Sequence, residues 1–188
     1  MNKSDKETIL EIKDLSVNYI STGNIISAVK KVSFSLEKNK MLGIIGETGS
    51  GKSSLIRAVN GLIKHPGTTS FDKLEILSKI GSSNIFDFSK MRGSEIGFIP
   101  QNPFGSLNPV YKIKKQFYFV NKKHQLFSKK EIGREIIKSL SEVGIADPER
   151  VSNSYSFELS GGMAQRVVIA LACFAKPRLL FADEPTTG

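Results

Sequence analysis

The chain of 188 residues is long enough for one sizeable core, and its 39% hydrophobic and 24% charged residues exclude a collagen-like or disordered protein. Its longest apolar runs, such as residues 167–175, fall well short of the ~20 residues that a membrane span needs, and the polar residues 1–7 do not resemble a secretory signal. We therefore expect a globular cytosolic protein.

The formal net charge of +9 leaves three interpretations open: a solvated lysine-rich surface, an anionic membrane face or a nucleic-acid surface. Short lysine clusters alternate with aromatic residues. We expect the aromatic side chains to lie in the core or to face a partner protein; the alternative is that they stack on RNA bases. These residues are Tyr111, Lys112, Lys114, Lys115, Phe117, Tyr118, Phe119, Lys122, Lys123, Lys129 and Lys130. The single cysteine, Cys173, lies in an apolar helical run and is expected to be buried.

Three strands are predicted in the first 45 residues. Residues 9–19 and 29–36 alternate apolar and polar side chains, as in Val32, Phe34 and Leu36, which is typical of half-exposed antiparallel strands. Residues 41–45 are apolar apart from Gly43, which predicts a strand buried on both faces of a parallel sheet. This strand is expected to lead directly into a glycine-rich turn.

Helical and strand patterns alternate along the rest of the chain. Helices are predicted at residues 53–63, at 129–143, where Ser128 and Glu131 form a capping-box pattern, and at 161–175. Short apolar strands are predicted at 96–99 and 179–182. The stretch 103–159 has helical patterns only, so it is expected to form a separate lobe. The order of elements indicates an α/β fold with an insertion.

The glycine-rich turn matches the phosphate-binding pattern G-x-x-x-x-G-K-[ST] between a predicted strand and a helix. Gly49 and Gly51 allow backbone conformations that point N–H groups at phosphate oxygens, and the helix N-terminus adds a positive field. Lys52 suits the β- and γ-phosphates and the Ser53 hydroxyl suits Mg²⁺, with Ser54 as the weaker choice. A turn that binds nothing is the alternative. The predicted cradle is Gly46, Glu47, Thr48, Gly49, Ser50, Gly51, Lys52, Ser53 and Ser54.

Two adjacent carboxylates, Asp183 and Glu184, follow the last predicted strand and so lie at the sheet edge where ligands gather. Asp183 is expected to hold Mg²⁺ through water, and Glu184, on the opposite side of the chain, to polarise the water that attacks the γ-phosphate. An apolar strand that ends in Asp-Glu is a weak pattern alone. Together with the cradle it predicts a site for ATP and Mg²⁺.

The sequence LSGGMAQR at residues 159–166 resembles the signature of ABC ATPases, whose usual form is LSGGQ. Met163 departs from that form, whereas Gln165 and Arg166 fit the version of peptide-importer ATPases. Residues 101–109, QNPFGSLNP, are similar to a loop of dipeptide, oligopeptide and nickel importer ATPases. The resemblance covers residues 9–188.

This resemblance implies one ABC ATPase domain over residues 1–188, with a P-loop NTPase (RecA-like) parallel core, an N-terminal antiparallel β subdomain and an α-helical subdomain inserted at about 103–165. It implies that Tyr19 stacks on adenine and that Gln101 contacts Mg²⁺ and the attacking water. It also implies that the signature closes over ATP bound to a partner subunit, through Ser160, Gly161 and Gly162. The alternative for Tyr19 is an aromatic side chain that only packs, and the alternative for Ser160 is an ordinary helix N-cap. The implied catalytic residues are Glu184, Gln101 and Lys52, and the implied Mg²⁺ ligands are Ser53, Gln101 and Asp183.

The expected function is hydrolysis of ATP to energise uptake of peptides or nickel, at the cytoplasmic face of the cell membrane. The implied partners are a second ATPase subunit, identical or different, membrane permease subunits and, indirectly, an extracytoplasmic substrate-binding protein; no nucleic acid is expected. A non-catalytic ATP-binding fragment and an ABC ATPase that acts on nucleic acid are the alternatives. Because the family continues past Gly188 into an aspartate loop and a switch histidine, the chain is expected to be incomplete and only weakly active alone.

Overall fold

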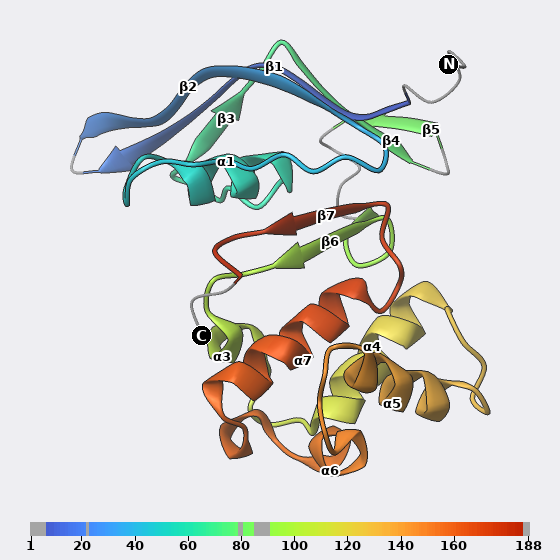
Figure 1. The fold of residues 1–188 in the computed structure, drawn as a ribbon. Coiled ribbons are helices and arrows are strands. Elements are labelled where there is room, and N and C mark those ends of the chain that lie inside the picture. The colour runs from blue at the N-terminus through green and yellow to red at the C-terminus, as the bar shows by residue number, and fades with distance from the viewer. Residues whose placement is uncertain (1–6, 22, 79–80, 85–90, 186–188) are drawn as a thin grey trace. The chain divides into compact units, whose positions relative to one another are not determined.

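The computed structural model describes residues 7–21, 23–78, 81–84 and 91–185. The chain forms two compact units, Met1–Arg92 and Gly93–Gly188. Their helices and strands are labelled in Figure 1. No helix in the described part of the chain is long and apolar enough to cross a membrane. The alternation of strands and helices confirms the predicted α/β class.

The first unit is built on an antiparallel sheet. Its strands are β1 (Thr8–Ser21), β2 (Asn24–Glu37), β3 (Thr68–Ser70), β4 (Lys73–Ser78) and β5 (Gly81–Asn84). The sheet order is β2-β1-β4-β5, with β3 paired to another part of β1. The two alternating segments of the sequence form β1 and β2, which pair along their whole length, so this prediction is confirmed.

A bulge in β1 keeps its apolar side chains on one face. Leu10 and Ile12 are buried, and so are Leu15 and Val17, although the two pairs differ in parity. The register of the β1–β2 ladder shifts between Ile12 and Leu15, and Asp14 within the shift has a φ of 52°. An extra residue of this kind reverses the alternation, so both pairs reach the core.

Helix α1 (Lys52–Val59) follows the glycine-rich turn and packs against β1 and β2 with Leu55, Ile56, Ala58 and Val59 buried. The helix ends earlier than predicted. Gly61 has a φ of 63°, its N–H donates to Ala58 O, and the N–H of Leu62 donates to Arg57 O at 2.8 Å. This pair of bonds is a Schellman motif, which terminates the helix before the proline.

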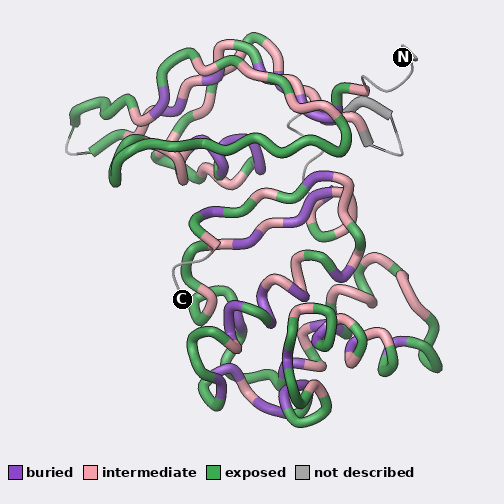
Figure 2. The backbone as a smooth tube through the Cα atoms, in the orientation of Figure 1, coloured by how far each residue is buried: buried purple, intermediate pink, exposed green. Residues whose placement is uncertain are grey.

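The prediction of a buried strand at residues 41–45 is wrong. The segment forms no strand, and 96% of Met41 and 99% of Ile45 are exposed; Figure 2 shows the whole stretch as an exposed tube. Burial of a parallel strand comes from strands on its two edges and helices on its faces. Within the described residues this segment pairs with no strand, so its apolar composition alone does not bury it.

The second unit contains a two-stranded parallel sheet, β6 (Ile96–Ile99) and β7 (Leu179–Ala182), at the predicted positions. Ile96 is aligned with Leu179 and Ile99 with Ala182. A close approach at Gly97 fixes how α7 meets this sheet: a Cβ there would lie 2.7 Å from Ala172 O and 2.7 Å from a Leu180 methyl. Only glycine fits at this point of β6.

Helices form the rest of the second unit. They are α3 (Pro103–Ser106), α4 (Ile113–His124), α5 (Ile132–Glu142), α6 (Pro148–Asn153) and α7 (Gly161–Cys173), with a 3-10 turn at Ser156–Glu158. Their shared core centres on Phe117, which is fully buried and meets the ring of Phe174 edge-on at 4.9 Å. Figure 2 shows the buried residues concentrated along α7 and the helices beside it. The helical composition predicted for this stretch is confirmed.

Cys173 is exposed at the end of α7, so its predicted burial is wrong. The buried residues of α7 and its cap, including Ala164, Val167 and Phe174, recur at helical spacing along one face. Cys173 falls outside that face. Neighbouring atoms still desolvate the sulfur enough to raise the pKa of the thiol, so exposure does not make it a reactive thiolate.

Candidate functional site

The predicted phosphate cradle lies in the first unit, immediately before α1. Gly51 is the N-cap of this helix with a φ of 96°, and Gly49 has a φ of 84°. A Cβ on Gly51 would lie 2.2 Å from Ala28 O of β2. Both the left-handed backbone and the close approach of β2 therefore require glycine. Loops that present their backbone amides to a ligand have the same requirement.

Lys52 folds back over this loop. Its Nζ donates to Gly46 O at 2.7 Å and to Glu47 O at 2.8 Å, while the N–H of Ser50 donates to Glu47 O at 3.1 Å. The ammonium group is therefore held inside the turn by neutral carbonyl oxygens. An anionic ligand would compete well for this ammonium, because hydrogen bonds between charged partners are stronger than those to neutral groups.

Tyr19, predicted to stack on adenine, lies near the end of β1 and close to the cradle. Its hydroxyl donates to Ser54 Oγ at 3.2 Å. Its ring leaves little room for a side chain at Gly67, where a Cβ would lie 3.1 Å from Tyr19 Cδ1. The Ser54 hydroxyl therefore accepts a hydrogen bond from Tyr19, and the choice of Ser53 as the metal ligand stays a prediction. The stacking role of Tyr19 stays a prediction.

The two carboxylates follow β7 in the second unit. Asp183 is 4% exposed and its N–H donates to Ile99 O at 2.9 Å, which continues the β6–β7 pairing. Glu184 is exposed and has a φ of 48°. A left-handed backbone is unfavourable for a residue with a Cβ and is concentrated at functional sites.

Gln101 and Glu184 meet at the carboxyl edge of this small sheet. Gln101 Nε2 donates to Glu184 Oε2 at 2.6 Å. The loop that carries Gln101 is ordered by α3, whose N-cap Asn102 accepts a hydrogen bond from Gly105 N at 3.0 Å. Two residues predicted to act together, separated by 83 positions in the sequence, are therefore in contact.

The predicted signature residues begin α7. Ser160 is its N-cap, and its hydroxyl accepts a hydrogen bond from Met163 N at 3.3 Å. Gly161 and Gly162 are exposed, and a Cβ on either would meet no atom within 4 Å. Glycine costs about 1 kcal/mol relative to alanine in a helix interior, whereas these two residues form the start of α7. Nothing in the described part of the chain therefore requires glycine at these two positions.

The structure thus distributes the predicted site residues over both units. Tyr19 and the cradle belong to the first unit, whereas Gln101, Asp183, Glu184 and the signature belong to the second. Among the described residues, no group of three or more His, Cys, Asp or Glu side chains could hold a metal ion by itself. The oxygen donors of Ser53, Gln101 and Asp183 nevertheless have the hard character that Mg²⁺ prefers.

One residue of this region was not predicted from its side-chain chemistry. Gln165 is 7% exposed on α7, and its Nε2 donates to Pro185 O at 3.0 Å, next to Glu184. The available signal is its position in the sequence, between Ala164 and the apolar run that begins at Val167. A glutamine on the buried face of a helix needs a polar partner.

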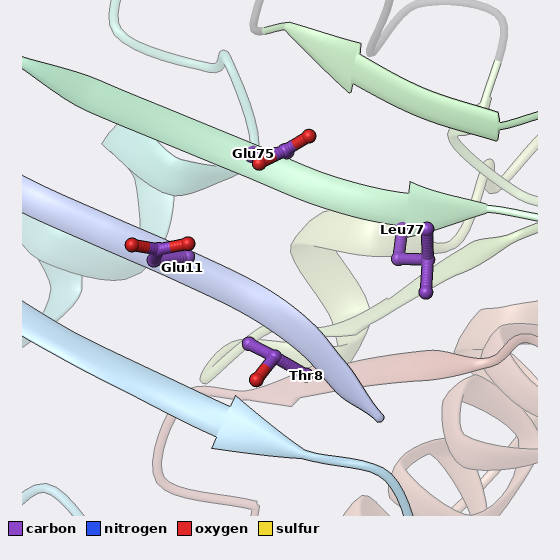
Figure 3. A pocket seen from close by; sticks show the side chains of 4 residues that line it. All are labelled: Thr8, Glu11, Glu75 and Leu77. Carbon is purple, nitrogen blue, oxygen red and sulfur yellow. The ribbon is translucent and has the colours of Figure 1, made fainter. Parts of the chain in front are cut away.

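A pocket on the sheet of the first unit contains none of the predicted residues. It is lined by Thr8 and Glu11 of β1 and by Glu75 and Leu77 of β4, as Figure 3 shows. Glu11 lies directly opposite Glu75, and Lys73 Nζ bridges the two carboxylates at 2.6 and 3.1 Å. The like charges are thus compensated within the sheet, and the pocket has no feature of a catalytic site.

An exposed aromatic and cationic surface surrounds the N-terminal half of α4. We name as the α4 surface Tyr111, Lys112, Lys115, Phe119, Tyr155 and Phe157. Tyr111 meets Phe119 edge-on at 5.0 Å, Tyr155 stacks on Phe157 at 5.5 Å, and the ammonium groups of Lys115 and Lys112 lie over Phe119 and Tyr155. Phe157 is 70% exposed. Among the aromatic residues that alternate with the lysine clusters, Phe117 is buried in the core, one of the two locations expected for them.

The sequence of residues 29–187 matches the profile of the ABC transporter family. The chain is 42% identical to the oligopeptide transport ATP-binding protein OppD of Bacillus subtilis (strain 168), over 96% of this chain and 51% of OppD. It is 39% identical to the dipeptide transport ATP-binding protein DppD of Escherichia coli (strain K12), over 96% of this chain and 55% of DppD. It therefore spans about half the length of the curated relatives that it matches.

A solved dimeric structure of an ATP-binding cassette, in a post-hydrolysis state bound to ADP and Pi, has the same fold. It superimposes with a TM-score of 0.77 at 26% identity, over 95% of this chain and 75% of that chain. The fold class, the phosphate-loop pattern and the signature pattern agree with this similarity. The chain belongs to the ABC transporter family.

Proposed function

We propose that the chain binds ATP with Mg²⁺ and hydrolyses it as the ATP-binding subunit of a peptide importer. The observation that carries this proposal is the cradle, where Gly51 admits no side chain and Lys52 lies over its own loop. Phosphoryl transfer requires mainly positioning and charge neutralisation. The donors and acceptors described above supply both.

We assign the roles as follows. The amides of the cradle and the ammonium of Lys52 bind the phosphates, and Tyr19 stacks on adenine. Ser53, Gln101 and Asp183 hold Mg²⁺, which neutralises phosphate charge. Glu184 accepts the proton of the attacking water, and the hydrogen bond from Gln101 keeps its carboxylate oriented.

A second copy of an ATP-binding subunit is the proposed partner at the start of α7. The support is the pair of glycines without a packing role, Gly161 and Gly162, beside the exposed N-cap Ser160. The N-terminus of this 13-residue helix attracts an anion. We propose that it contacts the γ-phosphate of ATP held by the partner, so that the two subunits, identical or different, are arranged head to tail.

We also propose that the α4 surface docks membrane permease subunits. From Ile96 to Lys130 the sequence has seven lysines and no acidic residue, so most of the net charge of +9 lies there. Aromatic residues are enriched in the cores of protein interfaces. This placement makes the chain a peripheral subunit at the cytoplasmic face of the cell membrane, which a substrate-binding protein serves only indirectly.

For the domain organisation, we propose one ABC ATPase domain in which residues of about 103–165 form a helical subdomain. Helices α3 to α6 all lie between β6 and α7 in the sequence, which supports an insertion. For the cargo, we propose peptides, because the relatives are named for oligopeptide and dipeptide transport. The loop that contains Gln101 and α3 carries the resemblance to this class.

The experiment is a comparison of ATP binding with ATP turnover by the purified chain, with and without Mg²⁺. We expect ATP to bind by calorimetry and phosphate to be released in single-turnover assays only with Mg²⁺. Binding without release would favour the non-catalytic alternative, and no binding at all would refute the proposal. Salt-dependent binding of single-stranded RNA to the α4 surface would instead favour the nucleic-acid alternative.

A further inference from the structure

Gln165 is a buried polar residue that contacts the turn formed by Asp183, Glu184 and Pro185, which we call the acidic turn. Its side chain lies on the core face of α7, near Ala164 and Val168, where an amide without a partner would be unfavourable. Its Nε2 donates to Pro185 O at 3.0 Å. The hydrogen bond joins the signature helix to the residue that follows Glu184.

The turn of Asp183, Glu184 and Pro185 is thereby fixed from three elements of the second unit. The N–H of Asp183 donates to Ile99 O of β6, and the carboxylate of Glu184 accepts from Gln101. Gln165 adds the attachment to α7. Because Glu184 has a left-handed φ of 48°, the turn needs such contacts to keep an unfavourable backbone conformation.

We propose that Gln165 is a positioning residue, which holds the carboxylate of Glu184 in place through Pro185 and ties it to the end of α7 that carries Ser160. A glutamine suits this position because its amide can donate to a carbonyl oxygen, whereas a carboxylate cannot. Since Ser160 and Gln165 belong to one rigid helix, a displacement of the signature is passed to the acidic turn. The consequence for hydrolysis rests on the proposed function; the contact itself does not.

The test uses two substitutions and a matched control in the whole chain. Gln165→Met keeps the length and apolar packing of the side chain but removes the donor, and Gln165→Glu replaces the donor by an acceptor. The control is Gln116→Glu, because Gln116 Nε2 also donates to backbone carbonyls, those of Asn108 and Tyr111 at 3.1 Å, away from the acidic turn.

The first measurement is amide hydrogen exchange of the peptide that contains Asp183, without nucleotide. We expect exchange to be roughly two- to tenfold faster in both Gln165 variants, as for the loss of one hydrogen bond, and unchanged in Gln116→Glu. Exchange equal to that of the unmodified chain in both Gln165 variants overturns the proposal. This outcome does not depend on ATP turnover.

The second measurement separates positioning from general destabilisation. We expect Gln165→Met to slow single-turnover hydrolysis by about tenfold, as for a misplaced catalytic group, while the Kd for ATP and the melting temperature stay close to those of the unmodified chain. A loss of ATP affinity and melting temperature in parallel with the rate would overturn the positioning role. Absence of hydrolysis in the unmodified chain would count against the proposed function, and the exchange experiment would then decide the role of Gln165 alone.

Discussion

Gln101 Nε2 donates a hydrogen bond to Glu184 Oε2 at 2.6 Å, although the two residues follow different strands. The contact exists because β6 and β7 are parallel neighbours, so both chains leave the sheet at the same edge. The Gln101 side chain occupies one oxygen of the carboxylate and fixes its orientation.

Glu184→Gln is expected to abolish hydrolysis while leaving ATP binding intact. An amide cannot accept the proton of the attacking water, and general-base catalysis contributes about 10²- to 10⁴-fold to a rate. We expect a decrease of at least about 100-fold in the single-turnover rate, with the Kd for ATP unchanged by calorimetry. A variant that retains a tenth or more of the rate would show that another group acts as the base.

Lys52→Ala is expected to weaken ATP binding. The substitution removes the only side-chain ammonium that hydrogen-bonds the carbonyls of the cradle in the described part of the chain. Hydrogen bonds to charged groups contribute about 1.5–3 kcal/mol, which corresponds to an increase of about 10- to 100-fold in Kd. The matched control is Lys64→Ala, an exposed lysine of the same unit, which should bind ATP normally. Equal affinities in the two variants would remove Lys52 from the site.

The sequence predicted those parts of the fold that depend on local periodicity. The alternation in β1 and β2, the apolar runs of β6 and β7 and the start of α7 at Ser160 all reflect side chains within a few residues. The extended β1–β2 pairing also required the bulge at Asp14, which no alternation pattern reveals. The prediction of a buried strand at residues 41–45 was wrong because burial of a strand depends on neighbours that are distant in the sequence.

The candidate site shows the same division. The phosphate loop and the Asp183–Glu184 pair are contiguous, so their residue types and spacing were enough to predict them. Gln101 was identified as a site residue only through the family resemblance, because a neutral amide carries no strong chemical signal of its own, and its hydrogen bond to Glu184 was not predicted. The contact of Gln165 with Pro185 was missed, since it depends on which face of α7 is buried.

Gly161→Ala and Gly162→Ala are expected to separate stability from function. A Cβ at either position meets open space, so alanine should preserve the fold or stabilise α7 by up to about 1 kcal/mol. If a partner subunit approaches this helix end, the same methyl groups should weaken ATP-dependent dimerisation. We would measure the dimer by light scattering with ATP in the Glu184→Gln background. Undiminished dimerisation by both variants would contradict a close approach at these glycines.

Glu131 provides a pH-dependent contribution to the stability of the second unit. Hydrogen bonds from Ser128, one of them from its backbone N–H at 3.0 Å, lower the pKa of the Glu131 carboxyl at the start of α5. A group with a lowered folded-state pKa stabilises the protein above its unfolded pKa of about 4.3 and loses that contribution as the pH falls through the folded pKa. Glu131→Gln should therefore be less stable than the unmodified chain at neutral pH and equal to it in acid. Urea unfolding at several pH values measures this difference, and a difference that grows in acid would contradict it.

Gly97→Ala is expected to destabilise the second unit by about 1–3 kcal/mol, the usual cost of overpacking. The added methyl group would lie 2.7 Å from Ala172 O and 2.9 Å from Pro177 Cγ, and the carbonyl of α7 cannot move without shifting the helix against β6. The matched control is Gly133→Ala in α5, where a Cβ meets no atom within 4 Å and alanine should be neutral or favourable. Urea unfolding of the two variants gives the comparison. Because β6 leads to Gln101 and α7 carries Gln165, a displaced helix should also loosen the turn at Glu184, and Gly97→Ala should accelerate amide exchange at Asp183. Normal exchange in a destabilised variant would show that the turn is held independently of the packing between α7 and β6.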